Sequence, residues 1–184
     1  MPTLRKTLLQ LLFIAVAVLC APNINAQRFA LKTNVVDWLT LSPNLTAEAR
    51  LSSRFSLQLG VAANPTHINI ANIQLTNFRV EPELRYWFNR PMARHFIALS
   101  ATAATYNLRF NDRHFCGDAV GAGVSYGYAL VLSNHWNMEF EVGVGLARIS
   151  AKDYRGSAQP PSKNYSHFKP VPMRLGLSFS YIFK

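Results

Sequence analysis

The chain ends on MRLGLSFSYIF (residues 173–183), in which every odd position holds a large apolar side chain. The positions between them are mostly small or polar: Arg174, Gly176, Ser178, Ser180 and Ile182. A strict period of two gives a β-strand one apolar and one polar face. A final strand of this kind, tipped by Phe179, Tyr181 and Phe183, predicts the closing strand of an outer-membrane β-barrel.

The N-terminus has the pattern of an export signal. Arg5 and Lys6 precede an apolar run from Leu8 to Cys20, which is too short to cross a bilayer comfortably as a helix. Small and polar residues follow, and cleavage after Ala26 would complete the pattern. We therefore expect a signal peptide at residues 1–26 and one barrel domain at residues 27–184.

Composition excludes several classes of protein. The chain has 19 Lys and Arg against 9 Asp and Glu, a formal net charge of +10, but no Lys/Arg-rich run, so we expect no nucleic-acid partner. After the signal no apolar run is long enough for a helical membrane span. Cys116 alone would remain, which excludes an intramolecular disulfide. We interpret Cys116 as a loop cysteine, and pairing between chains stays open.

Eight segments alternate in this way, and they predict an all-β, eight-stranded antiparallel up-and-down transmembrane barrel. The segments are Arg28–Val35, Asn44–Leu51, Phe55–Ala63, Asn77–Phe88, His95–Asn107, Ala119–Leu132, Trp136–Ala147 and Met173–Phe183. Short turns alternate with longer polar loops, namely Val36–Pro43, Asn64–Thr76, Leu108–Asp118 and Arg148–Pro172. Pro82 lacks an N–H and predicts a local bulge in the fourth segment.

The polar faces carry mixed charges, which favours an inverted barrel with a charged lumen. An eight-stranded lumen is just wide enough to be filled by side chains, and seven of the nine glycines lie on this face, where they leave room for long neighbours. Aromatic residues on the apolar face sit near the short turns, as an interfacial girdle would. The predicted lumen ion-pair network is Glu48, Arg50, Arg79, Glu81, Glu83, Arg85, Glu139, Glu141 and Arg174.

Two other readings stay open. A soluble lipocalin-like transport barrel would reverse the two faces, although the Gly-x-Trp signature of lipocalins is missing. A lipid-A-modifying enzyme would need a nucleophile near a histidine and an acid. His95 and Ser100 share a segment but have opposite parity, so they face apart, and the loop histidines lack metal-ligand spacing. We therefore predict no catalytic residues, no metal and no cofactor.

Several stretches together resemble a family of small outer-membrane barrels from Gram-negative anaerobes, known only as a domain of unknown function. They include Ala30–Asn34, Ser42–Leu45, Arg54–Leu57, Glu83–Trp87, Gly121–Tyr128 and Trp136–Gly145. The resemblance implies a barrel of the OmpA/OmpX type without catalytic residues, and some members of the family occur beside surface-fimbria components. Asn64-Pro65-Thr66 departs from the pattern, which expects an aromatic residue after the proline.

The sequence thus predicts a non-enzymatic monomer in the outer membrane, surrounded by lipid, with a structural or surface-interaction role. Its partner would be an envelope or fimbrial protein. The long loop Arg148–Pro172 mixes aromatic and cationic residues, a composition that suits recognition and equally suits an ordinary loop near anionic glycolipid headgroups. The candidate outer-loop contacts are Tyr154, Tyr165, His167 and Lys169.

Overall fold

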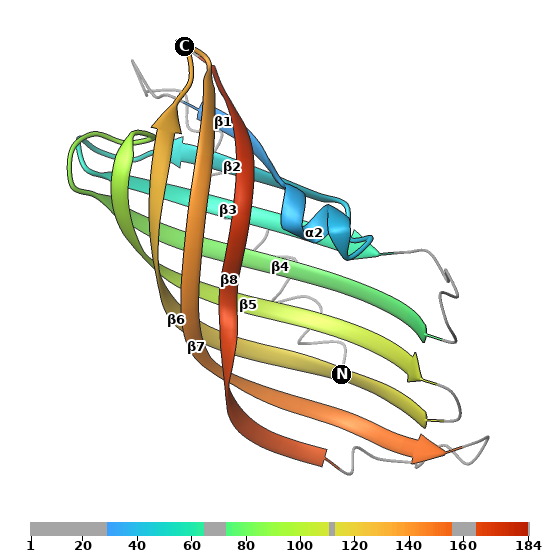
Figure 1. The fold of residues 1–184 in the computed structure, drawn as a ribbon. Helices are drawn as coiled ribbons and strands as arrows, with labels where there is room; N and C mark the ends of the chain where they lie inside the picture. Colours follow the sequence, from blue (N-terminus) through green and yellow to red (C-terminus); the bar gives the residue numbers. More distant parts are fainter. Residues whose placement is uncertain (1–28, 65–72, 111–112, 156–164, 184) are drawn as a thin grey trace, which may run out of the picture.

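The computed structural model describes residues 29–64, 73–110, 113–155 and 165–183 (Figure 1). The predicted signal peptide, residues 1–26, lies outside the described residues. The elements are β1 (Phe29–Asn34), α2 (Val35–Leu39), β2 (Asn44–Arg50), β3 (Phe55–Asn64), β4 (Ile73–Trp87), β5 (Arg94–Phe110), β6 (Arg113–Val131), β7 (Trp136–Arg155) and β8 (Tyr165–Phe183). Within these residues no helix is long and apolar enough to cross a bilayer.

The eight strands form one closed barrel in sequence order, which confirms the predicted antiparallel up-and-down fold. Closure comes from β1 and β8, which pair from Phe29↔Phe183 to Asn34↔Ser178. Three short turns, at residues 51–54, 88–93 and 132–135, join β2 to β3, β4 to β5 and β6 to β7. The start of β1 and the end of β8 lie at the same end of the barrel as these turns (Figure 1). A closed sheet has no free edge where the ring of strands is complete.

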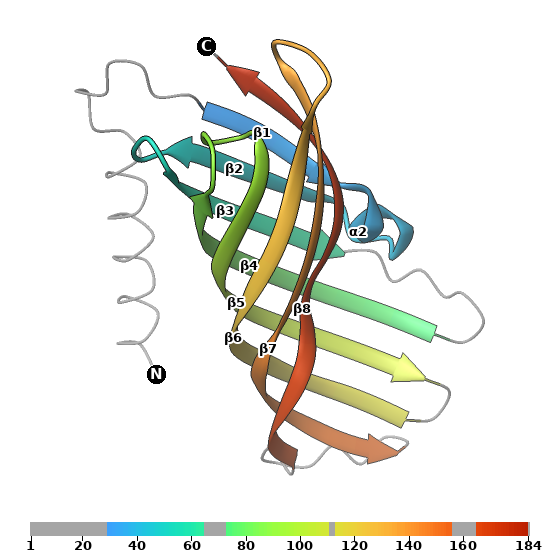
Figure 2. The ribbon, with the colours of Figure 1, turned by 60° about the vertical axis from the view of Figure 1, so that its left-hand side comes forward.

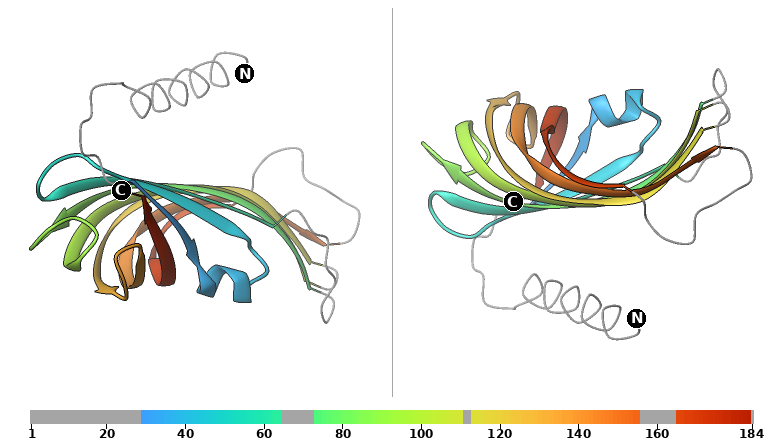
Figure 3. Two further views of the ribbon diagram at one scale, coloured as in Figure 1. Left: turned by 90° about the horizontal axis from the view of Figure 1, so that it is seen from above. Right: turned by 90° about the horizontal axis from the view of Figure 1, so that it is seen from below.

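One side of the barrel is much taller than the other. β1 and β2 have 6 and 7 residues, whereas β5 to β8 have 17 to 20 residues. Figure 2 shows α2 at the end of β1 and β2, with β4 to β8 running past it, and Figure 3 shows this part as a curved sheet. We call it the extension; it comprises residues 73–76, 105–110, 113–118, 148–155 and 165–172.

The predicted loops 108–118 and 148–172 are therefore wrong over most of their length. Tyr154 lies in β7, while Tyr165, His167 and Lys169 lie in β8. Cys116 lies in β6 rather than in a loop, and its Sγ contacts Asn107 Oδ1 at 3.2 Å. The ladder continues here although the alternation of polar and apolar residues fades, because backbone pairing does not require one face to be apolar.

A β-bulge at the start of the alternating stretch 173–183 turns the side chain of Met173 into the lumen. Gly143 pairs with Arg174 but Val144 pairs with Pro172, so Met173 is the extra residue. Its side chain is buried against the two-glycine pair Gly123↔Gly145, where added Cβ atoms would come within 2.7 and 2.5 Å of its Cγ. The period-two prediction therefore holds from Leu175 onward and is wrong for Met173.

The predicted bulge at Pro82 does not occur. Pro82 pairs with Leu59 on β3, and the register with β5 is the same before and after it, at Val80↔Ala103 and Glu83↔Ser100. The missing N–H interrupts the β4–β5 pairing without the insertion of a residue.

The two faces of the wall have opposite character. Large apolar side chains on the outer face are exposed, among them Leu99, Val124 and Val144 at 60–65 %. Charged side chains on the inner face are buried, Glu48 and Arg85 at 0 and 1 % exposure. Strand β5 follows the same rule, because Ile97 and Leu99 face outward while Ser100 is buried.

An apolar plug fills the end of the lumen beside the short turns. Trp87 and Phe96 are fully buried with their ring centroids 4.6 Å apart. Met92, from the β4–β5 turn, joins Ala30 and Ile182 in a second buried cluster. The lumen is thus closed by side chains at this end.

Substitution of Gly127 by Ala should destabilise the barrel by about 1–3 kcal/mol, the usual cost of overpacking. The new Cβ would overlap the ring of Phe96 and come within 2.7 Å of the Phe140 carbonyl oxygen. Gly176→Ala is the control, since its Cβ would meet only Asn34 at 3.6 Å or more. Guanidinium unfolding of the refolded barrel measures both variants, and equal midpoints would contradict the packing of Phe96 over Gly127.

Candidate functional site

The lumen contains a network of ion pairs centred on Arg85 of β4. Its Nη1 lies 2.8 Å from Glu139 Oε2 and 3.4 Å from Glu48 Oε2, and its Nη2 lies 2.7 Å from Glu141 Oε2. Its Nε donates a hydrogen bond to Glu83. One guanidinium therefore joins carboxylates from β2, β4 and β7 across the interior of the barrel.

The network rests on the apolar plug. The guanidinium carbon of Arg85 lies 4.2 Å from the centroid of the Phe96 ring, within cation–π range. Trp87 Nε1 donates to Ser56 Oγ at 2.7 Å, and that hydroxyl donates to Glu48. Both indole and hydroxyl are thus satisfied where they meet the charged groups.

Lys32 of β1 links the first strand to the network. Its Nζ lies 2.6 Å from Glu139 Oε2 and also contacts Glu48. Its side chain is buried together with both carboxylates. Lys32 alternates with apolar residues in β1, so the sequence pattern already placed it on the polar face and could have predicted it as part of the network.

A second layer of ion pairs lies closer to α2. Arg174 of β8 contacts Glu83 Oε2 through Nε at 3.0 Å and Glu81 Oε2 through Nη1 at 2.9 Å. Arg79 Nη2 reaches Asp37 Oδ2 of α2 at 2.8 Å. The chain of pairs therefore runs without a break from the apolar plug to the helix at the other rim.

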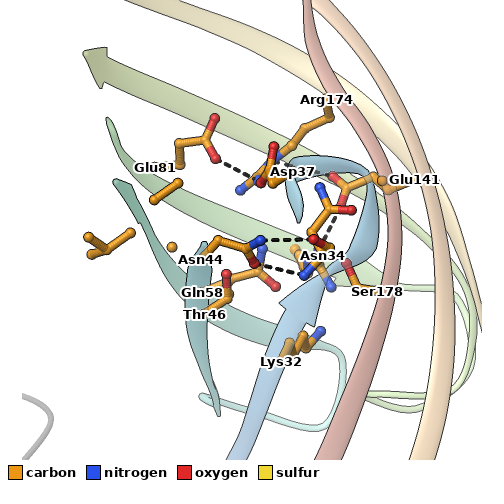
Figure 4. Close-up of a pocket in the computed structure, with 15 residues that line it drawn as sticks. Lys32, Asn34, Asp37, Asn44, Thr46, Gln58, Glu81, Glu141, Arg174 and Ser178 are labelled. Atoms are coloured by element: carbon orange, nitrogen blue, oxygen red, sulfur yellow. Dashed lines mark hydrogen bonds and ion pairs between the residues drawn. The ribbon is translucent and has the colours of Figure 1, made fainter. Parts of the chain in front are cut away.

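Helix α2 and its flanking residues cover the mouth of the lumen on the short side (Figure 4). Asn34 and Asn44 exchange hydrogen bonds, from Asn34 N to Asn44 Oδ1 at 2.7 Å and from Asn44 Nδ2 to Asn34 O at 2.8 Å. Asn34 Oδ1 also caps α2 and accepts from Leu177 N at 3.2 Å. Beneath the helix is a polar cavity of about 20 Å³, room for little more than a water molecule.

The structure brings together eight of the nine residues predicted for the network. Arg50 lies apart: its Nε donates to the carbonyl oxygen of Ser52 at 2.9 Å, and within the described residues it forms no ion pair. It stands at the end of β2, where the side chain reaches the turn instead of the lumen. The prediction missed Lys32 and Asp37, the latter because a one-turn helix inside a loop leaves no alternation to read.

Of the four predicted outer contacts, the structure describes the side chains of two. His167 and Lys169 are exposed on β8 of the extension. Tyr154 and Tyr165 belong to β7 and β8 by their backbone, and their side chains lie outside the described residues. The closing-strand residues Phe179, Tyr181 and Phe183 lie on the outer face beside the short turns, with the last two rings 4.9 Å apart.

In the described contacts, the lumen carboxylates and the candidate His–Ser pair have defined partners. The lumen carboxylates are held by Arg and Lys side chains, and the described residues contain no group of three or more His, Cys, Asp and Glu arranged to hold a metal ion. His95 faces outward and pairs with Tyr126, whereas Ser100 faces the lumen and donates to the Gly123 carbonyl. These two residues therefore do not meet.

Two comparisons with known proteins complete the description. A family model described as "Protein of unknown function (DUF3575)" matches residues 11–183, nearly the whole chain. No curated protein matches the chain.

Replacement of Arg85 by Met should cost about 3–5 kcal/mol of folding stability, because it leaves buried carboxylates without their partner. Arg50→Met is the matched control and should change stability by less than about 0.5 kcal/mol, since Arg50 bonds only a turn carbonyl. The temperature at which the fast-migrating folded band is lost on a detergent gel measures both. Equal losses in the two variants would argue against the network.

Proposed function

The chain belongs to the DUF3575 family, and we propose that it is a non-enzymatic outer-membrane barrel. In this proposal the closed part of the wall is embedded in the bilayer. The extension presents a surface to an envelope or fimbrial protein.

The observation that carries the proposal is the apolar outer wall around a charged interior. Leu99, Val124 and Val144 lie in one cross-strand row and are 60–65 % exposed. In water such a continuous apolar surface would be costly, whereas in a bilayer it is the favoured arrangement. On the inner face of β7, Glu139 and Glu141 lie in the lumen, where Lys32 and Arg85 neutralise them.

Aromatic side chains support this placement at both borders of the apolar wall. Beside the short turns, the ring centroids of Phe55 and Tyr86 are 5.3 Å apart, and those of Trp136 and Tyr181 are 5.2 Å apart. On the short side of the opposite rim, Trp38 of α2 is half exposed and donates to Thr33 Oγ1 at 2.8 Å. Amphipathic rings at two levels are typical of the two membrane–water interfaces.

The filled lumen favours an anchor over a channel. The apolar plug closes one end, the ion pairs span the middle and α2 covers the other end. Eight strands leave a lumen that side chains can fill completely, and the side chains at its centre are buried.

The extension is the surface that we assign to partner binding. On the outer face of β7, exposed Arg148 follows exposed Leu146, which marks the change from apolar wall to polar sheet. Above this level β8 carries exposed His167, Phe168 and Lys169. A cationic and aromatic mixture on a rigid sheet suits recognition.

Leu99→Arg tests the membrane placement. Leu99 lies within the apolar wall, so the substitution should cost about 2–4 kcal/mol of folding in lipid vesicles. Leu132→Arg is the matched control, because Leu132 is similarly exposed, 52 % against 60 %, but lies at the β6–β7 turn. Folding yield in vesicles, read from the heat-dependent shift of the gel band, measures the difference.

A soluble barrel would give another result. The mature chain would then remain in solution without detergent after cell fractionation, and the two Leu→Arg variants would fold equally well. Either finding would contradict the proposed membrane placement.

Partner binding is tested by a photo-crosslinking amino acid at Lys169, on the exposed β8 segment of the extension. We expect adducts with a protein of the envelope or of fimbriae in intact cells. The same crosslinker at Ser53, in the exposed β2–β3 turn, is the control. Identical adducts from both sites, or adducts with lipid alone from Lys169, would contradict a partner on the extension.

A further inference from the structure

The outer wall has an apolar groove along β5 near the short turns. Ile97 at its floor pairs with Tyr86 on one side and with Tyr126 on the other, and Leu99 lies one row farther along. The two larger tyrosine rings form the sides of the groove. Its volume is about 640 Å³, within the range of small-molecule sites, and its lining is almost wholly apolar.

An arginine and a histidine stand at the end of the groove beside the short turns. Arg54 Nη1 donates to the hydroxyl of Tyr86 at 2.9 Å. His95 Nδ1 and the hydroxyl of Tyr126 share a hydrogen bond of 2.5 Å. His95 precedes Ile97 by two residues and therefore lies on the same face. The Tyr86 side of the groove thus ends at the guanidinium of Arg54, and the Tyr126 side ends at the imidazole of His95.

The charge of this end of the barrel has one sign. Exposed or half-exposed Arg50, Arg54, Arg90 and Arg94 lie in or next to the short turns. Among the described residues no exposed carboxylate accompanies them, because the glutamates of the neighbouring strands face the lumen. A surface with an apolar length and a cationic end is complementary to an anionic lipid.

We propose that this groove binds one acyl chain of an anionic phospholipid, with the lipid phosphate at Arg54 and His95. This site rests on the proposed membrane placement. It would bind an anionic phospholipid of the leaflet that lies beside the short turns. Guanidinium matches phosphate geometry with paired hydrogen bonds. From His95 to Leu99 the strand rises about 13 Å. With a strand tilt of about 40° this is about 10 Å along the bilayer normal, roughly two thirds of one leaflet of a ~30 Å hydrocarbon core.

The opposite side of the aromatic girdle provides an internal control. His135 stacks on Tyr181 with ring centroids 5.7 Å apart, and Trp136 packs against the same tyrosine. The described contacts place no arginine on these rings. Aromatic chemistry alone would thus give both sides equal affinity for lipid, whereas the proposed site needs Arg54.

Native mass spectrometry of the folded full-length mature chain tests the site. The barrel is released from detergent micelles that hold equal amounts of dioleoyl phosphatidylglycerol and dioleoyl phosphatidylcholine. We expect one phosphatidylglycerol to be retained about tenfold over phosphatidylcholine, because both lipids carry the phosphate but only phosphatidylcholine adds a cation, which the arginines at this end repel. Arg54→Gln combined with His95→Gln should abolish the preference, and His135→Gln should keep it.

A second variant separates the groove from the charge. Ile97→Trp fills the groove floor and leaves Arg54 and His95 in place, so it should reduce retention of phosphatidylglycerol in a barrel that still shows the heat-dependent gel shift. Soluble glycerol phosphate at millimolar concentration should not displace the lipid.

Three outcomes would overturn the site: equal retention of the two lipids by the folded wild-type barrel, unchanged preference in the double variant, or displacement by glycerol phosphate. Each of these leaves the proposed membrane placement standing. Failure of the wild-type chain to fold into micelles or vesicles would overturn both.

Discussion

The ion pairs of Arg85 fix which face of each neighbouring strand points inward. A slip of one residue in β2 or β7 would move a glutamate to the apolar outer wall and remove a partner of Arg85, and the same slip in β4 would move Arg85 itself out of the lumen. Buried ion pairs contribute little net stability compared with apolar packing, but the loss of one partner is expensive. The network therefore acts chiefly as a register lock, and the closed barrel depends on it because closure requires all eight registers to agree.

The packing around the network follows from the narrow lumen. Where Arg85 and Phe96 fill the interior, the residue paired with Phe96 on the neighbouring strand is Gly127, and where Met173 turns inward it meets Gly123 and Gly145. Small residues on one strand thus accommodate large ones on another. The bulge has the same explanation. Met173 fills the space beside the glycine pair, and Arg174 next to it still forms its ion pair with Glu83.

Much of this arrangement could be predicted from period two in the sequence. The order of the strands, the side that faces inward and eight network residues follow from alternation, because every strand within the apolar wall has one polar and one apolar face. Alternation fails where that contrast ends. In the extension both faces carry polar groups, so residues 148–155 and 165–172 resemble loops although they pair. The bulge at Met173 and the Asp37–Arg79 contact depend on partners distant in sequence, which no local pattern reports.

The β8 edge of the extension is open, and its residues limit how a partner could bind. β1 ends at the pair Asn34↔Ser178, so within the described chain no strand covers that side of β8 above this level. Two prolines, Pro170 and Pro172, lie on this edge, and a proline in an edge strand turns its nitrogen to the open side. Two donors that an added strand would need are therefore missing, and Lys169, directly before the first proline, adds a charge. A partner at this edge must bind through side chains rather than by extending the sheet.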